Sequence, residues 1–251
     1  MDDGNIEAKI ALFIDLDNLA LGVREAKYKK LEIQKIIERL REKGKLVVKR
    51  AYADWDSFSE YKRPFHEAAV ELLDIPRKKI SGKNSGDIRM VVDAMDLCYS
   101  KDHIQIFALG SGDSDFSPLV SKLKENDKHV IGIGVKDSTS RLLVDNCDEF
   151  IFYEDLVRPL KRQPLVPKGL TRKQGEVFSR LQDAIEALQR ENKHVLWGSL
   201  VKQVIQRKHP EFNESYFGYR SFQALLEDAR ERKLIELEWD ARSGTYIVIP
   251  V

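Results

Sequence analysis

Short apolar runs alternate with longer amphipathic segments from residue 9 to about residue 157, and this pattern restricts the fold more than any other feature. Several apolar runs lack a strict apolar-polar alternation, which is typical of strands buried on both faces. Strands that alternate with helices favour a parallel sheet covered by helices on both sides. We therefore predict an α/β fold with a three-layer, Rossmann-like parallel-sheet domain. The predicted strands are 9–14, 46–53, 76–80, 104–109, 129–134 and 149–152, and the predicted helices are 31–43, 58–73, 86–100, 115–126 and 138–145.

A second, smaller domain is predicted after a proline-rich stretch. Residues 158–170 contain three prolines and four basic residues, which indicates an extended linker. Three helical patterns and two strand-like segments follow it, and this order of elements is typical of a winged helix. The helical patterns cover 171–191, 196–207 and 214–232, and the strand-like segments cover 234–239 and 245–250. The domain limits we predict are 8–157 for the first domain, 158–169 for the linker and 170–251 for the second domain.

Composition restricts the partners and the location of the protein. The chain has 42 Lys and Arg residues and 41 Asp and Glu residues, so any basic surface for nucleic acid must be local. Its two cysteines, Cys98 and Cys147, lie in apolar patterns and support neither a disulfide framework nor a zinc site. No apolar run approaches the roughly 20 residues that a membrane span needs, and the acidic N-terminus has no signal-like region. We therefore expect a cytoplasmic protein without a membrane partner.

Acidic residues follow two of the predicted strands and open one predicted helix. Asp15 ends the first strand, and Asp113 and Asp115 follow the strand 104–109 after a glycine-rich turn. Asp87 lies in the first turn of the helix 86–100. In an open α/β sheet, the carboxyl ends of the strands and the N-termini of the returning helices share one edge, where ligands bind. We therefore expect these four carboxylates to converge.

Converging carboxylates repel each other, and a bound cation relieves this repulsion. Oxygen ligands without a nearby His or Cys favour Mg²⁺ or Mn²⁺ over zinc. Such an ion activates water and stabilises charge at a phosphodiester, so the pattern indicates metal-dependent hydrolysis. Each acid also has a structural alternative. Asp87 and Asp113 are suitable helix caps, Asp17 is a suitable turn residue, and Asp93 and Asp96 suit a solvated helix face.

The first domain resembles the NYN domain in its LabA-like (DUF88) branch, a relative of the PIN nucleases. The resemblance rests on FIDLDNL at 13–19, SGDIRMVVDAMDL at 85–97, the segment 107–134 that begins FALGSGDSDF, and the segment 138–156 that begins STSRLL. It implies a Mg²⁺-dependent ribonuclease, which we expect to be an endonuclease. Carried over by motif, the acidic positions of the family fall most directly on Asp15, Asp87 and Asp113, and further ones fall on Asp115 and Asp93.

The second domain resembles the OST-HTH/LOTUS domain. FGYRSFQALLEDARERKLIEL at 217–237 and GTYIVIP at 244–250 carry this resemblance. It implies a winged helix that binds RNA or a protein partner, so RNA is the expected ligand of the whole chain, with DNA not excluded. The candidate nucleic-acid-binding residues are Lys78, Lys79, Lys83, Arg141, Tyr216, Tyr219 and Arg220. For the basic residues the alternative is a solvated surface, and for Tyr219 it is a place in the core.

Two other functions remain open at this point. A haloacid-dehalogenase-type phosphatase also starts its sheet with Asp-x-Asp, and Asp15 and Asp17 would then be nucleophile and acid/base. That family has a Thr two residues after the second Asp, where this chain has Leu19. The second alternative is a non-catalytic module that binds RNA or a partner through the same fold.

Overall fold

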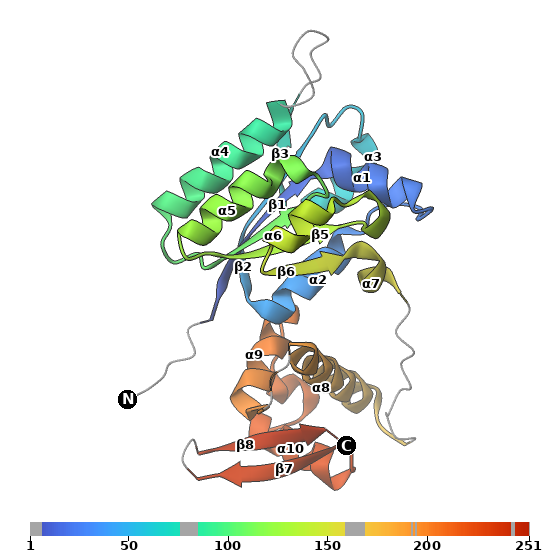
Figure 1. Ribbon diagram of the computed structural model, residues 1–251. Helices are drawn as coiled ribbons and strands as arrows, with labels where there is room; N and C mark the ends of the chain where they lie inside the picture. Colours follow the sequence, from blue (N-terminus) through green and yellow to red (C-terminus); the bar gives the residue numbers. More distant parts are fainter. Residues whose placement is uncertain are drawn as a thin grey trace. The chain divides into compact units, whose positions relative to one another are not determined.

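The computed structural model describes residues 7–75, 85–158, 169–191, 193, 195–241 and 244–250 (Figure 1). The chain divides into two compact units near residue 159, apart from the three residues Arg41–Lys43, which group with the second unit. Among the described helices, none has both the length and the hydropathy of a membrane span.

The first unit is built on a six-stranded parallel sheet, which confirms the predicted α/β class. Its strand order is β3-β2-β1-β4-β5-β6, so the order reverses direction between β1 and β4. In a doubly wound sheet this reversal opens a crevice at the carboxyl ends of the two strands. The strands are β1 (Lys9–Asp15), β2 (Lys45–Ala53), β3 (Glu71–Asp74), β4 (Ile106–Gly110), β5 (His129–Gly134) and β6 (Glu149–Phe152).

Helices cover both faces of this sheet (Figure 1). Residues of β1 alternate between the two resulting cores, because Leu12 packs in one and Phe13 in the other. The core that contains Leu12 is closed by α1 (Leu16–Glu25), α2 (Ile33–Lys43), α3 (Ser59–Glu67) and α7 (Tyr153–Val157). The core that contains Phe13 is closed by α4 (Ser85–Ser100), α5 (Ser117–Glu125) and α6 (Arg141–Asn146), with the short helix η1 (Ser114–Phe116) before α5. Another short helix, η2 (Lys136–Ser138), follows β5.

The local predictions differ from the structure at one helix, miss another and include one strand that the structure does not describe. The helix predicted over 58–73 ends at Glu67, because the chain turns at Ala69 with a positive φ of 52° and then enters β3. The strand predicted at 76–80 lies outside the described residues. Helix α1 was not among the predicted helices, although Leu16, Leu19 and Val23 follow a helical period and are buried.

The described part of the second unit contains three α-helices and the short helix η3, followed by an antiparallel hairpin, which is the order of elements predicted for a winged helix. The elements are α8 (Arg172–Arg190), α9 (Gly198–Lys208), η3 (Glu214–Phe217), α10 (Phe222–Glu231), β7 (Ile235–Asp240) and β8 (Thr245–Pro250). The predicted helix 214–232 is divided into η3 and α10 by Gly218, whose φ of 91° ends η3. Thr171 and Gln174 form a capping box at the start of α8.

Candidate active site

The carboxylate of Asp15 lies at the reversal of strand order and is held by two hydrogen bonds. Asp15 is the last residue of β1 and caps α1, so its carboxylate accepts a hydrogen bond from the Asn18 backbone N–H at 3.2 Å. The Ser111 hydroxyl, just beyond β4, donates a second hydrogen bond to it at 3.1 Å. The Asn18 side-chain carbonyl in turn accepts from the Gly112 backbone N–H at 2.7 Å. These contacts join the ends of β1 and β4.

Asp113 and Asp115 follow in the same loop. The Asp113 backbone N–H donates to the Ser111 hydroxyl, and the Asp113 carboxylate caps η1 by accepting from the Asp115 N–H at 3.0 Å. Gly112 is packed so tightly that a Cβ there would lie 2.8 Å from the Ser138 carbonyl oxygen. The loop that carries the two acids is therefore fixed on both sides, by α1 and by the segment after β5.

Asp87 approaches from the first turn of α4. Burial raises the pKa of the Asp87 carboxyl, and the nearby charges of Asp113, Asp115 and Asp17 raise it further. Burial also raises the pKa of Asp15 to about 7; the Asn18 hydrogen bond opposes this effect, and the charge of Asp87 adds to it. Each of these acids thus responds to carboxylates from other elements, which means that one negative site joins the ends of β1 and β4 to the start of α4.

The donor set of this site matches a hard divalent cation. Carboxylate and hydroxyl oxygens are the ligands that Mg²⁺ and Mn²⁺ prefer. Within the described ranges, no three Asp, Glu, His or Cys side chains are close enough to share one metal ion. The carboxylates therefore affect each other's ionisation without forming a closed set of ligands, and a cation would have to draw them together.

A groove of about 670 Å³ lies beside the acidic cluster and is continuous with it. Asp87 and Asp115 line the groove together with residues of α4, α5 and α6. Its walls are mainly apolar, in contrast to the cluster itself. The site consequently offers two adjacent environments, one strongly negative and one apolar.

Asp93 does not join this cluster. Its carboxylate accepts a hydrogen bond from the Tyr52 hydroxyl at 2.8 Å and pairs with Arg89 Nε at 3.1 Å. Arg50 lies 3.9 Å from the same carboxylate. Asp93 therefore links α4 to β2, and its negative charge is compensated by Arg89 and Arg50. This placement differs from the catalytic position that the motif implied.

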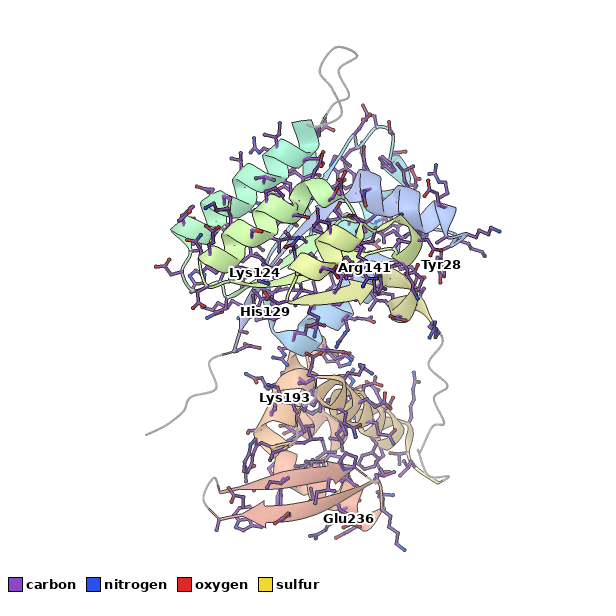
Figure 2. All side chains as sticks on the ribbon, in the orientation of Figure 1. Tyr28, Lys124, His129, Arg141, Lys193 and Glu236 are labelled. Atoms are coloured by element: carbon purple, nitrogen blue, oxygen red, sulfur yellow. The ribbon has the colours of Figure 1, made fainter. Side chains whose placement is uncertain are left out.

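The structure describes only some of the predicted basic residues. Lys78, Lys79 and Lys83 lie outside the described residues. Arg141 is the first residue of α6, where its side chain is exposed and lies 3.6 Å from Asp145 (Figure 2). Its neighbour Leu142 lines the groove beside the cluster, so Arg141 is at the margin of the candidate site.

In the second unit, the three predicted nucleic-acid-binding residues lie in different environments. Tyr216 is 61% exposed, and the Lys173 ammonium lies 4.2 Å from the centre of its ring. Arg220 is exposed as well. Tyr219 is half-buried against the core, and its hydroxyl donates to Asp228 at 2.5 Å. Tyr219 therefore takes the core position given above as its alternative, whereas the Tyr216 side chain is largely exposed.

Sequence reasoning missed two residues that organise the site. Ser111 is almost fully buried and bridges the Asp15 carboxylate and the Asp113 N–H. Asn18 is not among the predicted site residues, but its side chain accepts a hydrogen bond from the loop after β4. The available signal was their place in the chain, since Ser111 directly follows β4 and Asn18 lies in the first turn of α1, just after β1.

A doubly wound parallel sheet with carboxylates at its reversal of strand order is consistent with a PIN-like α/β domain. The chain belongs to the NYN domain family, whose match covers residues 9–154, more than half of the sequence. This family is part of the PIN-like nuclease superfamily, and its members act on nucleic acid, usually with divalent metals.

Two individual proteins are similar to this chain. An uncharacterized protein of Methanocaldococcus jannaschii is 33% identical over 145 residues, which are 58% of this chain and 55% of that protein. The chain thus matches about half the length of this relative. The crystal structure of a protein of unknown function from Vibrio parahaemolyticus has 25% identity and a TM-score of 0.55, and the match covers 61% of this chain and 98% of that one.

Proposed function

We propose that this chain is a ribonuclease that depends on Mg²⁺ or Mn²⁺ and hydrolyses RNA phosphodiester bonds at the acidic cluster, as an endonuclease. The observation that carries the proposal is the convergence of Asp15, Asp87, Asp113 and Asp115 from three separate elements, with raised pKa values at Asp15 and Asp87. Such a repulsive arrangement is costly for folding alone, and it is what a cation site for phosphodiester hydrolysis requires.

In this proposal, the same four carboxylates hold the cation. A bound Mg²⁺ or Mn²⁺ supplies positive charge for the phosphodiester and lowers the pKa of its bound water. The Ser111 hydroxyl and the Asn18 N–H keep the Asp15 carboxylate in one orientation. The Asp113 carboxylate is oriented by the N–H of Asp115. We assign Asp93 a structural role, because Tyr52 and Arg89 already occupy its carboxylate.

We further propose that the second unit is a winged helix of the OST-HTH/LOTUS type, which recognises RNA or a protein partner. Its three helices and terminal hairpin support this assignment. The exposed ring of Tyr216, with Lys173 beside it, suits stacking on an unpaired base. Exposed Arg220 suits a phosphate contact.

The family match favours a nuclease over the phosphatase alternative. A haloacid-dehalogenase-type phosphatase has a Thr two residues after its second Asp, whereas this chain has Leu19, which is buried in the core. A non-catalytic module could bind RNA through the same fold. The following experiment must therefore distinguish RNA cleavage from RNA binding alone.

The experiment measures cleavage of labelled single-stranded RNA, with single-stranded DNA in parallel, in Mg²⁺, in Mn²⁺ and in EDTA. The test variant is Asp87→Asn, and its matched control is Asp96→Asn, the same change at an exposed position of the same helix. We expect EDTA to abolish RNA cleavage and Asp87→Asn to lower its rate by roughly a hundredfold or more, as is usual when one active-site group is removed. Asp96→Asn should cleave like the wild type. RNA binding without cleavage in either metal would contradict the proposal and favour the binding module.

A further inference from the structure

The groove beside the acidic cluster exposes three large apolar side chains, which the proposed chemistry does not explain. Ile88 and Val92 lie one turn apart on α4 and are 62% and 57% exposed. Leu142, on α6, is 57% exposed and lines the same groove. Single exposed apolar residues are common, but three that line one concave surface next to a polar site indicate a binding function.

The polar groups of the groove are unsuited to phosphate. Its charged lining residues are Asp87 and Asp115, and it has no Lys, Arg or His among its lining residues within the described ranges. Phosphate oxygens would be repelled there. The other polar lining groups are serine hydroxyls, from Ser114 in η1 and from Ser117 and Ser121 in α5. The groove therefore selects an uncharged group with apolar faces and a polar edge.

One of these hydroxyls has an unused hydrogen-bonding capacity. Ser117 is 8% exposed, and its Oγ is buried with no hydrogen-bond partner among the described residues. A buried hydroxyl without a partner is costly and calls for a ligand or an ordered water. Because Ser117 lines the groove, a small shift on ligand binding would satisfy this hydroxyl.

We infer that the groove binds a nucleobase, namely a base adjacent to the phosphodiester at the acidic cluster. This inference rests on the proposed function, since it needs an RNA strand at the cluster. Asp87 and Asp115 belong to both the cluster and the groove, so a nucleotide with its phosphate at the cluster places its base within reach. A base has apolar faces for Ile88, Val92 and Leu142 and a polar edge for the serines.

Abasic substrates test the inference directly. Two abasic RNA substrates are prepared, each with one abasic residue, placed on one side or on the other side of the cleaved bond. Their kcat/KM values are compared with that of intact RNA for the wild type, Val92→Ala and Leu142→Ala. The control is Tyr99→Ala, an exposed position of α4 outside the groove. We expect each groove variant to lower kcat/KM on intact RNA by about tenfold, as the loss of a buried apolar contact predicts. On the abasic RNA that lacks the bound base, groove variants and wild type should be equal.

A second readout separates this inference from the proposed function. RNA that carries 2-aminopurine at the same position is titrated with protein in Ca²⁺, and fluorescence reports whether the base leaves its neighbours. We expect the 2-aminopurine fluorescence to increase when the wild type or Tyr99→Ala is added. The increase should be smaller with Leu142→Ala. If this pattern appears without any cleavage in Mg²⁺ or Mn²⁺, the proposed function fails and the base site stands.

Other outcomes overturn the inference. If RNA is cleaved but groove variants lose the same activity on intact and abasic RNA, the groove does not bind a base. If Leu142→Ala leaves cleavage unchanged and abolishes self-association in sedimentation, the groove is an interface between two copies of the chain. If the protein neither cleaves RNA nor changes 2-aminopurine fluorescence, both the inference and the proposed function fail.

Discussion

The Ser111 hydroxyl donates a hydrogen bond to the Asp15 carboxylate at 3.1 Å and thereby connects the ends of the two strands at which the sheet order reverses. This contact is reinforced by the hydrogen bond from Gly112 to the Asn18 side chain. The carboxylates of the site are therefore positioned by neutral polar residues, and the site depends on residues that carry no charge.

Replacing Ser111 by Ala should impair the nuclease without unfolding it. The hydroxyl lowers the pKa of the Asp15 carboxyl, so its loss raises this pKa. If ionised Asp15 is required, the acid limb of the rate-against-pH profile should shift to higher pH, and the rate at pH 7 should fall. The measurement is a pH-rate profile in Mn²⁺ with Ser100→Ala, an exposed serine of α4, as the control. An unchanged profile would show that Ser111 does not act through Asp15.

The stability of the metal-free protein should fall as the pH rises. Folding raises the pKa of Asp15 to about 7, compared with about 3.9 in an unfolded chain. The raised pKa favours the folded state below about pH 4, and this advantage is lost as the pH rises through 7. In EDTA, the melting temperature should therefore decrease between pH 5 and pH 8, and Asp15→Asn should remove much of the decrease.

Bound metal should counteract this loss of stability at high pH. In the proposed site, Mg²⁺ or Mn²⁺ would bind the ionised carboxylates, so it should raise the melting temperature of the wild type more at pH 8 than at pH 5. The same thermal scans on Asp15→Asn serve as the control. Equal stabilisation of wild type and variant at both pH values would contradict a cation site at Asp15.

Asp93 should matter for stability and not for catalysis. Asp93→Asn weakens the pairs with Tyr52 and Arg89 that join α4 to β2. We expect the free energy of unfolding to fall by about 1–3 kcal/mol, the usual effect of disrupting a mostly buried polar pair. The cleavage rate at a temperature where the variant is folded should stay close to that of the wild type. Denaturant unfolding and single-turnover cleavage measure the two quantities, and a folded but inactive variant would return Asp93 to the catalytic set.

In the second unit, Tyr216 should contribute to RNA affinity and Tyr219 should not. Tyr216→Ala removes an exposed ring and should weaken binding of single-stranded RNA by about tenfold, as is typical for one base-stacking contact. Tyr219→Phe removes the hydroxyl that binds Asp228 and should lower only stability. Anisotropy titrations at fixed salt measure the affinity. Equal affinity of Tyr216→Ala and wild type would exclude stacking on this ring.

The sequence predicted the parallel sheet because its strands are buried on both faces and appear as short apolar runs between helices. It also predicted that Asp15, Asp87, Asp113 and Asp115 lie near one another, since residues at strand ends and helix starts lie at one edge of such a sheet. The prediction of a helix over 58–73 was wrong at its end, because the helical apolar pattern continues into β3. A positive φ at Ala69 ends that pattern, and this conformation has no sequence signature in an alanine.

Side-chain partners were harder to predict than positions. The motif that contains Asp93 places it on α4, but its role depends on Tyr52 from β2, 41 residues earlier. The sequence likewise leaves Tyr219 open between a nucleic-acid contact and the core, and the hydrogen bond from its hydroxyl to Asp228 involves a partner that the pattern does not indicate. Such pairs depend on tertiary contacts between elements, and local periodicity carries no information about them.

The most direct test of the central claim is a titration of the metal-free protein with Mn²⁺, followed by electron paramagnetic resonance of the free ion. The claim is that carboxylates from β1, the loop after β4 and α4 form a single cation site. The account predicts that Asp15→Asn, Asp87→Asn and Asp113→Asn each weaken binding by at least about tenfold, while Asp96→Asn binds like the wild type. Wild-type affinity in these three variants, or no binding by the wild type, would contradict it.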